Sequence, residues 1–371
     1  MMKVLLIGEY SNVHNTLAEG LRILGHKVVV ASNGDFWKDY PRDIDLRRDA
    51  GVAGSISFFS RLVGALPRMK GYDVVQIINP MFMELKAEKI WSIYRYLRRN
   101  NDKLVLGAFG MDYYWVHENI TRKPLRYSDF NIGDQLRTDA DAKKEIADWL
   151  DTTKGQLNQY IAHNCDAIVA GLYEYWACYH PLFPKKTFFI PFPIKPMMTI
   201  DDIEESVHLP IKMFIGVSRY RSSYKGTDVM LKAAQKIQEK YPGHVLLTVA
   251  QGIPFRQYVQ MMSDSDVILD QLYSYTPAMN ALEAMSRGVI CVGGGEPENY
   301  SIINERQLHP IVNVEPDADS VFKALQQLII HPEVIPSLKK QSIMYIQRHH
   351  DFIQVAKTYE RLYLDLLGTS K

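Results

Sequence analysis

Two positively charged side chains follow an apolar run in the segment FIGVSRYRSSYKGTDVMLKAA. Arg219 and Lys225 stand in the loop after this run, just before a helix predicted to begin at Gly226. Two cations and the free backbone N–H groups of a helix N-terminus suit a diphosphate, because charge-assisted bonds and the helix dipole act on the same anion. The loop is therefore a candidate diphosphate site. The alternative interpretation is a solvated basic loop.

A second candidate segment is DVILDQLYSYTPAMNALEAMSRGVICVGG. Its apolar run ends at Asp270 and Gln271, an aromatic loop follows, and a predicted helix carries Glu283. A carboxylate at that place can accept two hydrogen bonds from ribose hydroxyls, while the helix N-terminus around Asn280 can face phosphate. The alternative is that Glu283 only interacts favourably with the helix dipole.

These two segments belong to an alternation of short apolar runs and helical patterns that continues along the chain. The predicted strands are 3–7, 28–31, 74–78, 104–107 and 167–169 in the first half, and 211–216, 244–248, 267–270 and 289–292 in the second. Continuous apolar runs separated by helices are typical of parallel strands covered on both faces. The sequence therefore predicts an α/β protein with two Rossmann-like, doubly wound domains.

The segment KTFFIPFPIKP predicts the boundary between the two halves, because a strand there runs into three prolines. We expect a first domain over residues 1–190 and a second over 191–351. The last amphipathic helix, about 352–371, can pack on either domain. The prediction allows for this helix to pack back on the first domain. A polar insertion at about 115–150 is expected to carry binding function or to cap a cleft.

The Arg-and-Lys-Gly loop and the later L-E-A-M-x-x-G helix together resemble the donor half of GT-B glycosyltransferases. The likeness is greatest to the large retaining, family 4-like group that uses nucleotide sugars. The N-terminal segments KVLLIG, LAEGLRILGHKVVV and GYDVVQIINP resemble the acceptor domain of that group, so the likeness covers nearly the whole chain. The resemblance implies two domains facing each other across a cleft, a nucleotide-diphosphate-sugar donor, no separate cofactor, and a glycan or lipid-linked acceptor.

The resemblance also implies roles for particular residues. Arg219 and Lys225 match the cationic pair that holds the donor diphosphate, and Glu283 matches the second of two glutamates, the one that binds the ribose. The first glutamate of that pair would fall at Tyr275, where the family usually contacts the transferred sugar. Asp112, in GAFGMDYYW, stands where such enzymes often place a polar group at the cleft. Arg219, Lys225 and Asp112 are thus the candidate catalytic residues, with a capping aspartate as the alternative for Asp112.

The first strand is followed by the loop GEYSNVHNTLAEG, which keeps one glycine of a dinucleotide-binding Gly-x-Gly-x-x-Gly motif. This argues against a dehydrogenase. Gly8 is a candidate donor-binding residue, with Gly8, Glu9 and the next helix N-terminus facing a ligand, and the alternative is a plain connection. His14 is interpreted as a surface histidine, with a helix-cap or acceptor-side place as the alternative.

Charge and cysteine content exclude several classes. The chain has 371 residues and a formal net charge of +1, so no global field marks a nucleic-acid binder. Three scattered cysteines fit neither a disulfide framework nor a structural zinc site and suggest a reducing compartment. Asp-x-Asp triplets at 43–45, 139–141 and 264–266 are not expected to hold a metal.

Location is predicted from two further features. We expect a cytoplasmic protein, because neither a signal peptide nor a membrane-spanning apolar run is recognisable. Residues 36–126 carry 16 Lys and Arg against 10 Asp and Glu, interleaved with aromatic residues. Such a pattern suits either a peripheral contact with the inner face of a membrane or a solvated basic face.

The predicted function is transfer of a sugar from a nucleotide-diphosphate sugar, as in polysaccharide biosynthesis, and the resemblance implies retention of anomeric configuration. Two alternatives stay open. One is a nucleotide-sugar epimerase of the same shape, and the other is a nucleotide-sugar-binding protein without catalysis, suggested by the absent glutamate at Tyr275.

Overall fold

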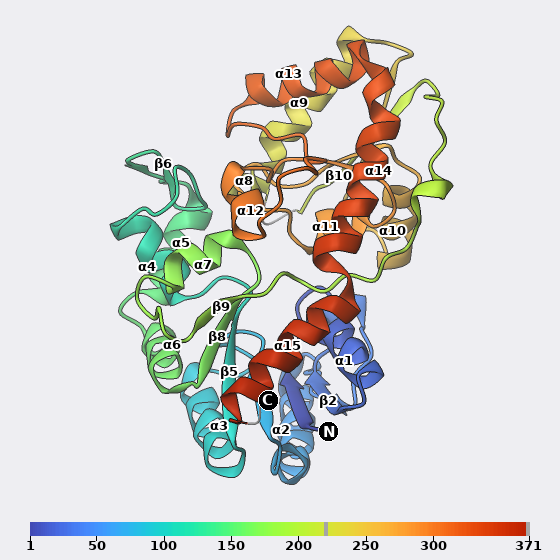
Figure 1. Cartoon of the computed structure of the whole chain (residues 1–371). Coiled ribbons are helices and arrows are strands. Elements are labelled where there is room, and N and C mark those ends of the chain that lie inside the picture. The colour runs from blue at the N-terminus through green and yellow to red at the C-terminus, as the bar shows by residue number, and fades with distance from the viewer. Residues whose placement is uncertain (219–221, 369–371) are drawn as a thin grey trace.

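A computed structural model describes residues 1–218 and 222–368 of the chain and shows two α/β lobes, one above the other in Figure 1. The N-terminal lobe is built on a seven-stranded parallel sheet of order β3-β2-β1-β4-β5-β8-β9. Its strands are β1 (Lys3–Ile7), β2 (Lys27–Ser32), β3 (Ile44–Asp45), β4 (Val74–Ile77), β5 (Lys103–Ala108), β8 (Ala167–Ala170) and β9 (Thr187–Phe189). The sequence prediction of parallel strands is confirmed for this lobe.

Helices connect these strands and cover both faces of the sheet. They are α1 (Val13–Ile23), α2 (Gly51–Ala65), α3 (Ala87–Asn100), α4 (Tyr113–Thr121), α5 (Ala140–Trp149), α6 (Thr153–Asn164) and α7 (Tyr173–Tyr179). The insertion between β5 and β8 also contains a small antiparallel hairpin, β6 (Asn131–Ile132) and β7 (Gln135–Leu136). In Figure 1 this hairpin projects beside the C-terminal lobe.

The C-terminal lobe has a four-stranded parallel sheet of order β11-β10-β12-β13. Its strands are β10 (Ile211–Gly216), β11 (Val245–Ala250), β12 (Val267–Leu269) and β13 (Ile290–Val292). Its helices are α8 (Ser222–Lys225), α9 (Thr227–Lys240), α10 (Phe255–Ser263), α11 (Met279–Met285), α12 (Pro297–Ile302), α13 (Ala318–Ile330) and α14 (Ile335–Tyr345). Both lobes therefore consist of parallel strands that alternate with helices, and the α/β class predicted from the sequence is confirmed.

The chain crosses between the lobes along two neighbouring segments. The backbone N–H of Ile194 donates to the carbonyl of His350, and the N–H of Phe352 donates to the carbonyl of Ile194. The final helix, α15 (Phe352–Leu366), then runs back across the N-terminal lobe (Figure 1). It packs closely on α1, where Gly20 has no Cβ and so allows Ala356 to approach.

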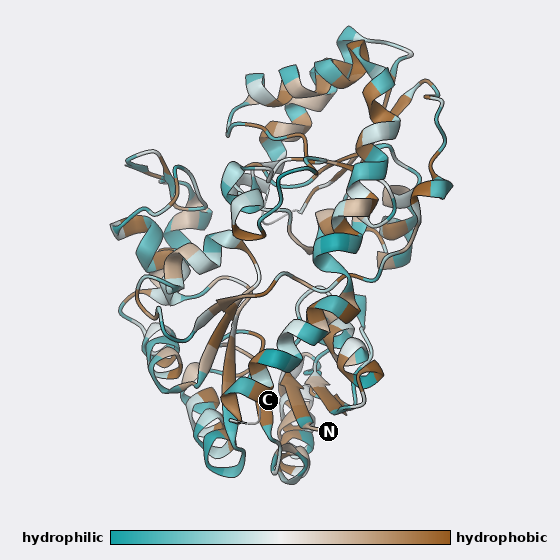
Figure 2. Ribbon diagram, in the orientation of Figure 1, coloured by the Kyte–Doolittle hydropathy of each residue, from teal (hydrophilic) through white to brown (hydrophobic). Residues whose placement is uncertain are grey.

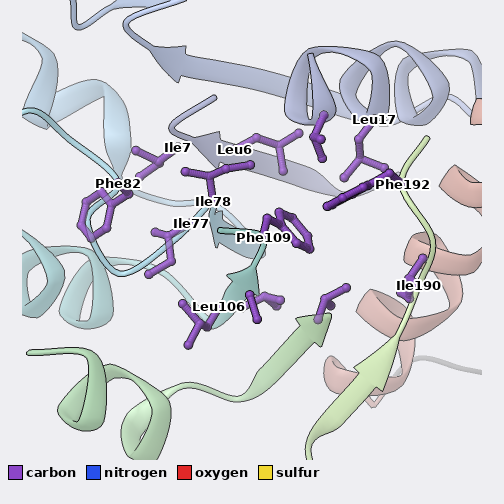
Figure 3. Close-up of a cluster of buried hydrophobic side chains, with 14 of the residues drawn as sticks. Leu6, Ile7, Leu17, Ile77, Ile78, Phe82, Leu106, Phe109, Ile190 and Phe192 are labelled. Atoms are coloured by element: carbon purple, nitrogen blue, oxygen red, sulfur yellow. The ribbon is translucent and has the colours of Figure 1, made fainter. Parts of the chain in front are cut away.

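Apolar side chains at the carboxyl ends of the N-terminal strands form a continuous buried cluster (Figure 3). Ile7, Ile78 and Phe109 come from three neighbouring strand ends, and Phe192 of the inter-lobe crossing packs on Phe109 with ring centroids 5.2 Å apart. In Figure 2 the strands of the N-terminal lobe are mostly brown, whereas the helices alternate between teal, white and brown along their length. This cluster gives the face between the lobes a rigid apolar support.

Within the described ranges 1–218 and 222–368, no helix combines the length and the apolar character needed to cross a bilayer.

Candidate functional site

A cavity of about 960 Å³ lies between the two lobes. The N-terminal lobe supplies residues that follow strand ends, among them Gly8 after β1, Asn33 after β2 and Asn79 after β4. The C-terminal lobe contributes Lys225 and Gln271. Ligands of open parallel sheets bind outside the carboxyl ends of the strands, so this is the expected place for a substrate.

The loop after β1 forms a closed turn at the cavity. Gly8 has a φ of 85°, and a Cβ at this position would collide with Ile78, so both the backbone angle and the space require glycine. The next residue, Glu9, accepts hydrogen bonds from the backbone N–H groups of His14 (3.2 Å) and Asn15 (2.8 Å). Burial raises the pKa of Glu9 to about 7, although these bonds oppose the shift.

Glu9 occupies the N-terminus of α1, which the sequence analysis expected to face a ligand. Two N–H groups in its first turn are bonded to a side chain of the protein and are not directed to a ligand. His14 is fully buried, contrary to the surface position expected from the sequence, and its Nδ1 lies 2.8 Å from the carbonyl oxygen of Gly8. Burial lowers the pKa of His14 to about 3, so the ring is a neutral structural support of the turn.

On the opposite wall, Lys225 ends α8 and lines the cavity. Gly226 follows with a φ of 70°, where a side chain would collide with Leu272, and it starts α9. The Lys225 carbonyl accepts the N–H of Leu272 at 2.9 Å, which fixes this loop to the end of β12. Arg219, the other predicted cation, lies outside the described residues.

The positive charge of Lys225 lowers the pKa of two buried carboxyl groups relative to the effect of burial alone. Burial raises the pKa of Asp129 to about 6 and also raises the pKa of Asp270, and in both cases the Lys225 ammonium opposes the shift. Gln271, next to Asp270, lines the main cavity and a smaller neighbouring cavity of about 160 Å³. The structure thus brings together Gly8, Lys225 and Gln271, three of the predicted site residues, at one cavity.

Asn280 lies behind this wall. Its Nδ2 donates to Asp270 Oδ1 at 3.0 Å, and its Oδ1 accepts the hydroxyl of Tyr258 at 3.0 Å. Among the described residues that line the two cavities, Asn280 does not appear. Asn280 therefore holds the Asp270 side chain in position at the end of β12.

Glu283 is on α11, and its carboxylate pairs with Arg287 one turn later at 2.6 Å. The side chain is about one third exposed, with a relative accessibility of 36%. Tyr40 of the N-terminal lobe has its pKa raised by burial and by the negative charges of Asp35, Glu9 and Glu283. The charge of Glu283 thus acts on the loop after β2, although Glu283 is not among the described residues lining the main cavity.

Tyr275 occupies a different environment from the one expected. The side chain is 1% exposed, and its ring lies between Tyr127 at 4.8 Å and Tyr173 at 6.1 Å, both from the N-terminal lobe. Its hydroxyl oxygen accepts the backbone N–H of Arg126 at 2.7 Å. The ring is therefore enclosed by side chains of the opposite lobe, whereas contact between Tyr275 and the transferred sugar stays a prediction.

The same loop is fixed by Glu174, a residue that the sequence analysis did not single out. This buried carboxylate on α7 accepts the N–H groups of Tyr275 (2.7 Å) and Thr276 (2.9 Å). It also accepts the hydroxyls of Ser274 (2.9 Å) and Thr276 (2.5 Å). No local pattern in GLYEYWACYH indicates this role, since the donors lie about 100 residues away.

The insertion after β5 forms a second contact between the lobes. Arg126 pairs with Glu296 and, at 2.6 Å, with Glu298, both at the start of α12. The hydroxyl of Tyr127 donates to Glu296 at 2.5 Å, and Asn313 donates to the same carboxylate oxygen at 3.0 Å. The insertion thus joins the lobes beside the cleft, as a cap would.

Asp112 is fully buried at the N-terminus of α4. Its Oδ1 accepts the N–H of Trp115 at 2.8 Å, and its Oδ2 accepts the hydroxyl of Tyr179 at 2.7 Å. It is absent from the described lining of both cavities. This placement is the one that the capping alternative describes, whereas contact with substrate stays a prediction.

Asp112 gives a test in which pH separates these two roles. Burial raises the pKa of Asp112 to about 7. A carboxyl whose pKa is higher in the folded state than in the unfolded chain makes folding less favourable as pH rises from about 4 to about 7. We expect Asp112→Asn to remove this decline. Between about pH 4.5 and 7.5, the free energy of unfolding of the variant should rise by at least about 1 kcal/mol relative to that of the wild type.

Denaturant unfolding at both pH values measures that difference, with nucleotide affinity as the accompanying readout. Asparagine caps helices about as well as aspartate, so the fold and the affinity should persist. A pH-independent difference would refute the burial argument. A tenfold loss of affinity would return Asp112 to the site.

Neither a protein-family model nor a curated protein matches the sequence. Solved structures do match in fold. Sucrose-phosphate synthase from Thermosynechococcus elongatus has a TM-score of 0.62 at 14% identity, with complete coverage of both chains. HepE of Anabaena, solved with UDP and glucose, has a TM-score of 0.58 at 11% identity, covering 98% of this chain and 100% of its own.

A UDP-GlcNAc 2-epimerase from Neisseria meningitidis, solved with UDP-GlcNAc, has a TM-score of 0.54 at 12% identity, with coverage of 98% and 100%. These likenesses establish the architecture: the chain has the two-domain fold of GT-B glycosyltransferases. The epimerase has this fold as well, so the architecture by itself leaves both activities open.

Proposed function

We propose that the protein is a GT-B glycosyltransferase that moves a hexosyl group from a nucleotide-diphosphate sugar to a hydroxyl of a glycan or lipid-linked acceptor. The observation that carries this proposal is the inter-lobe cavity, where Lys225 and Gln271 face Gly8 and Asn79 across the carboxyl ends of two parallel sheets. The nucleotide-bound structures of similar fold support the choice of donor.

In this proposal the C-terminal wall binds the donor. The Lys225 ammonium lies against the diphosphate and stabilises the charge that develops on the leaving group. Glu283 accepts the ribose hydroxyls from α11, and Gln271 lies nearest the transferred sugar. The donor phosphate oxygen can take the acceptor proton in a front-face reaction with retention, so this route requires no protein base.

The N-terminal wall binds the acceptor in the same proposal. It offers polar groups of Asn33, Asn79 and Glu84 together with the aromatic rings of Phe36 and Trp149. Amides and carboxylates can hydrogen-bond sugar hydroxyls, and aromatic rings cover the apolar faces of sugars. This mixture favours a sugar or sugar-bearing acceptor.

Turnover is expected to survive excess EDTA, because fixed cations take the electrostatic role that a metal has in other transferases. The measurement is release of nucleoside diphosphate from a matching donor and acceptor, before and after chelation. Loss of activity with EDTA and recovery with manganese would contradict this expectation. Attention would then return to Asp264 and Asp266, which in this structure bond to Gln260 and to Lys339.

A second candidate is a nucleotide-sugar epimerase, favoured by the epimerase of similar fold. The two activities differ in what happens to the donor alone. An epimerase would produce a new nucleotide sugar without any acceptor, whereas the proposed transferase needs an acceptor for its transfer product. Binding of the donor without either reaction, over a panel of acceptors, would favour a non-catalytic binding protein.

A further inference from the structure

Helix α2 exposes a row of large apolar side chains. Val52, Ile56, Phe59 and Val63 are 79%, 66%, 59% and 50% exposed, respectively. Their spacing of four, three and four residues places them on one face of the helix. Since the opposite face is buried through Phe58 and Leu62, α2 is apolar on both sides, which is unusual for a helix that faces water.

Cations flank α2 in the sequence, with Arg47 and Arg48 just before the helix and Arg68 and Lys70 just after it. Residues 47–70 contain five Lys and Arg and one acidic residue, Asp49, which gives a local charge of +4. Arg47 and Arg61 approach carboxylates, whereas Arg48, Arg68 and Lys70 have no ion pair with any residue in the described ranges. An exposed apolar row on a helix with basic residues at both of its ends is the composition of a helix that lies in a membrane interface.

We propose that the outer face of α2 docks on an anionic lipid bilayer. Val52, Ile56, Phe59 and Val63 enter the boundary between headgroups and acyl chains, while the neighbouring cations lie among lipid phosphates. A second copy of the chain fits this face less well. A symmetric contact would place one +4 segment against another with no acidic surface between them.

The direction of α2 relates this surface to the cleft. The helix begins after β3, at the carboxyl edge of the sheet, and leads to β4, which starts at the opposite edge. Arg48, just before α2, donates to the carbonyl of Glu84 at 3.2 Å, and Glu84 and Leu46 both line the cavity. A lipid-linked acceptor held in the same bilayer would therefore meet the acceptor wall, a step that rests on the proposed function.

Vesicle co-sedimentation of the full chain tests the docking surface without any donor or acceptor. Vesicles of phosphatidylcholine alone are compared with vesicles in which one third of the lipid is phosphatidylglycerol. We expect the wild type to bind the anionic vesicles, and Ile56→Ser with Phe59→Ser to lower the partition coefficient at least about tenfold. The matched control is Ile23→Ser with Ile330→Ser, two exposed apolar residues at 60% and 48%, which should bind like the wild type.

A charge variant completes the test. Arg68→Gln with Lys70→Gln should weaken binding to the anionic vesicles by about fivefold for each cation removed. Unchanged binding of the Ile56 and Phe59 variant, or equal binding to neutral and anionic vesicles, would overturn the proposal. The proposal would also be overturned if the wild type did not bind vesicles but formed a dimer in light scattering, and the Ile56 and Phe59 variant were monomeric. Because no nucleotide is present, these results are independent of whether the protein transfers sugar.

Discussion

Replacing Lys225 by alanine is expected to weaken nucleoside-diphosphate binding by about 1.5–3 kcal/mol, or roughly ten- to a hundredfold in Kd. Lys225 ends α8 at the cavity wall and is followed directly by the N-terminus of α9, so its ammonium and the helix dipole act on one anion. Calorimetric titration with UDP, GDP and ADP at constant salt measures the change.

Two further variants make this result specific. Lys225→Arg keeps the charge and should retain most of the affinity. Lys232→Ala removes an exposed cation from α9, away from the described cavity lining, and should bind like the wild type. Equal affinity of wild type and Lys225→Ala for the best nucleotide would exclude Lys225 from the donor site.

Tyr275→Ala is expected to lower the free energy of unfolding by about 3–5 kcal/mol, the range for removing a large buried ring. The ring fills the contact between the lobes, against Tyr127 and Tyr173, so a cavity would remain there. Tyr275→Phe keeps the ring and loses only the bond from the Arg126 N–H, with an expected cost of about 1 kcal/mol. Denaturant unfolding of the three proteins gives both values.

The two Tyr275 variants also separate a structural role from sugar recognition. If Tyr275 holds the lobes together, Tyr275→Phe should keep normal nucleotide affinity and turnover. A Phe variant with wild-type stability but greatly reduced transfer would show that the hydroxyl acts on the substrate. An Ala variant as stable as the wild type would refute the packing argument.

The strands and the donor-side loop could be predicted from local sequence, because both depend on nearby residues. Strands such as Lys3–Ile7 and Ile211–Gly216 belong to parallel sheets that are covered on both faces. Such strands consist of nearly uninterrupted apolar residues, which can be recognised in the sequence. Lys225 and Gly226 could be placed at a helix N-terminus because the strand before them and the helix after them are both recognisable. Their position at the inter-lobe cavity follows from that order.

The contacts between the lobes were beyond such reasoning. Glu174 and the loop at Tyr275 are about 100 residues apart, and Arg126 and Glu296 are about 170 apart, so no local pattern pairs them. The expected place of Tyr275 rested on its offset from Glu283 alone, which says nothing of what packs against the ring. The bounds of helix α2 could not be predicted within the basic stretch 36–126, because apolar residues on both of its faces, with glycines between them, hide the helical period.

Binding of nucleotides to the wild-type protein tests the central claim most directly. In a thermal-shift panel confirmed by calorimetry, we predict that one of UDP, GDP and ADP raises the Tm and binds with a stoichiometry of one, while CMP, which lacks the second phosphate, binds much more weakly. The account is contradicted if none of the three diphosphates binds, or if CMP binds as tightly as the best of them.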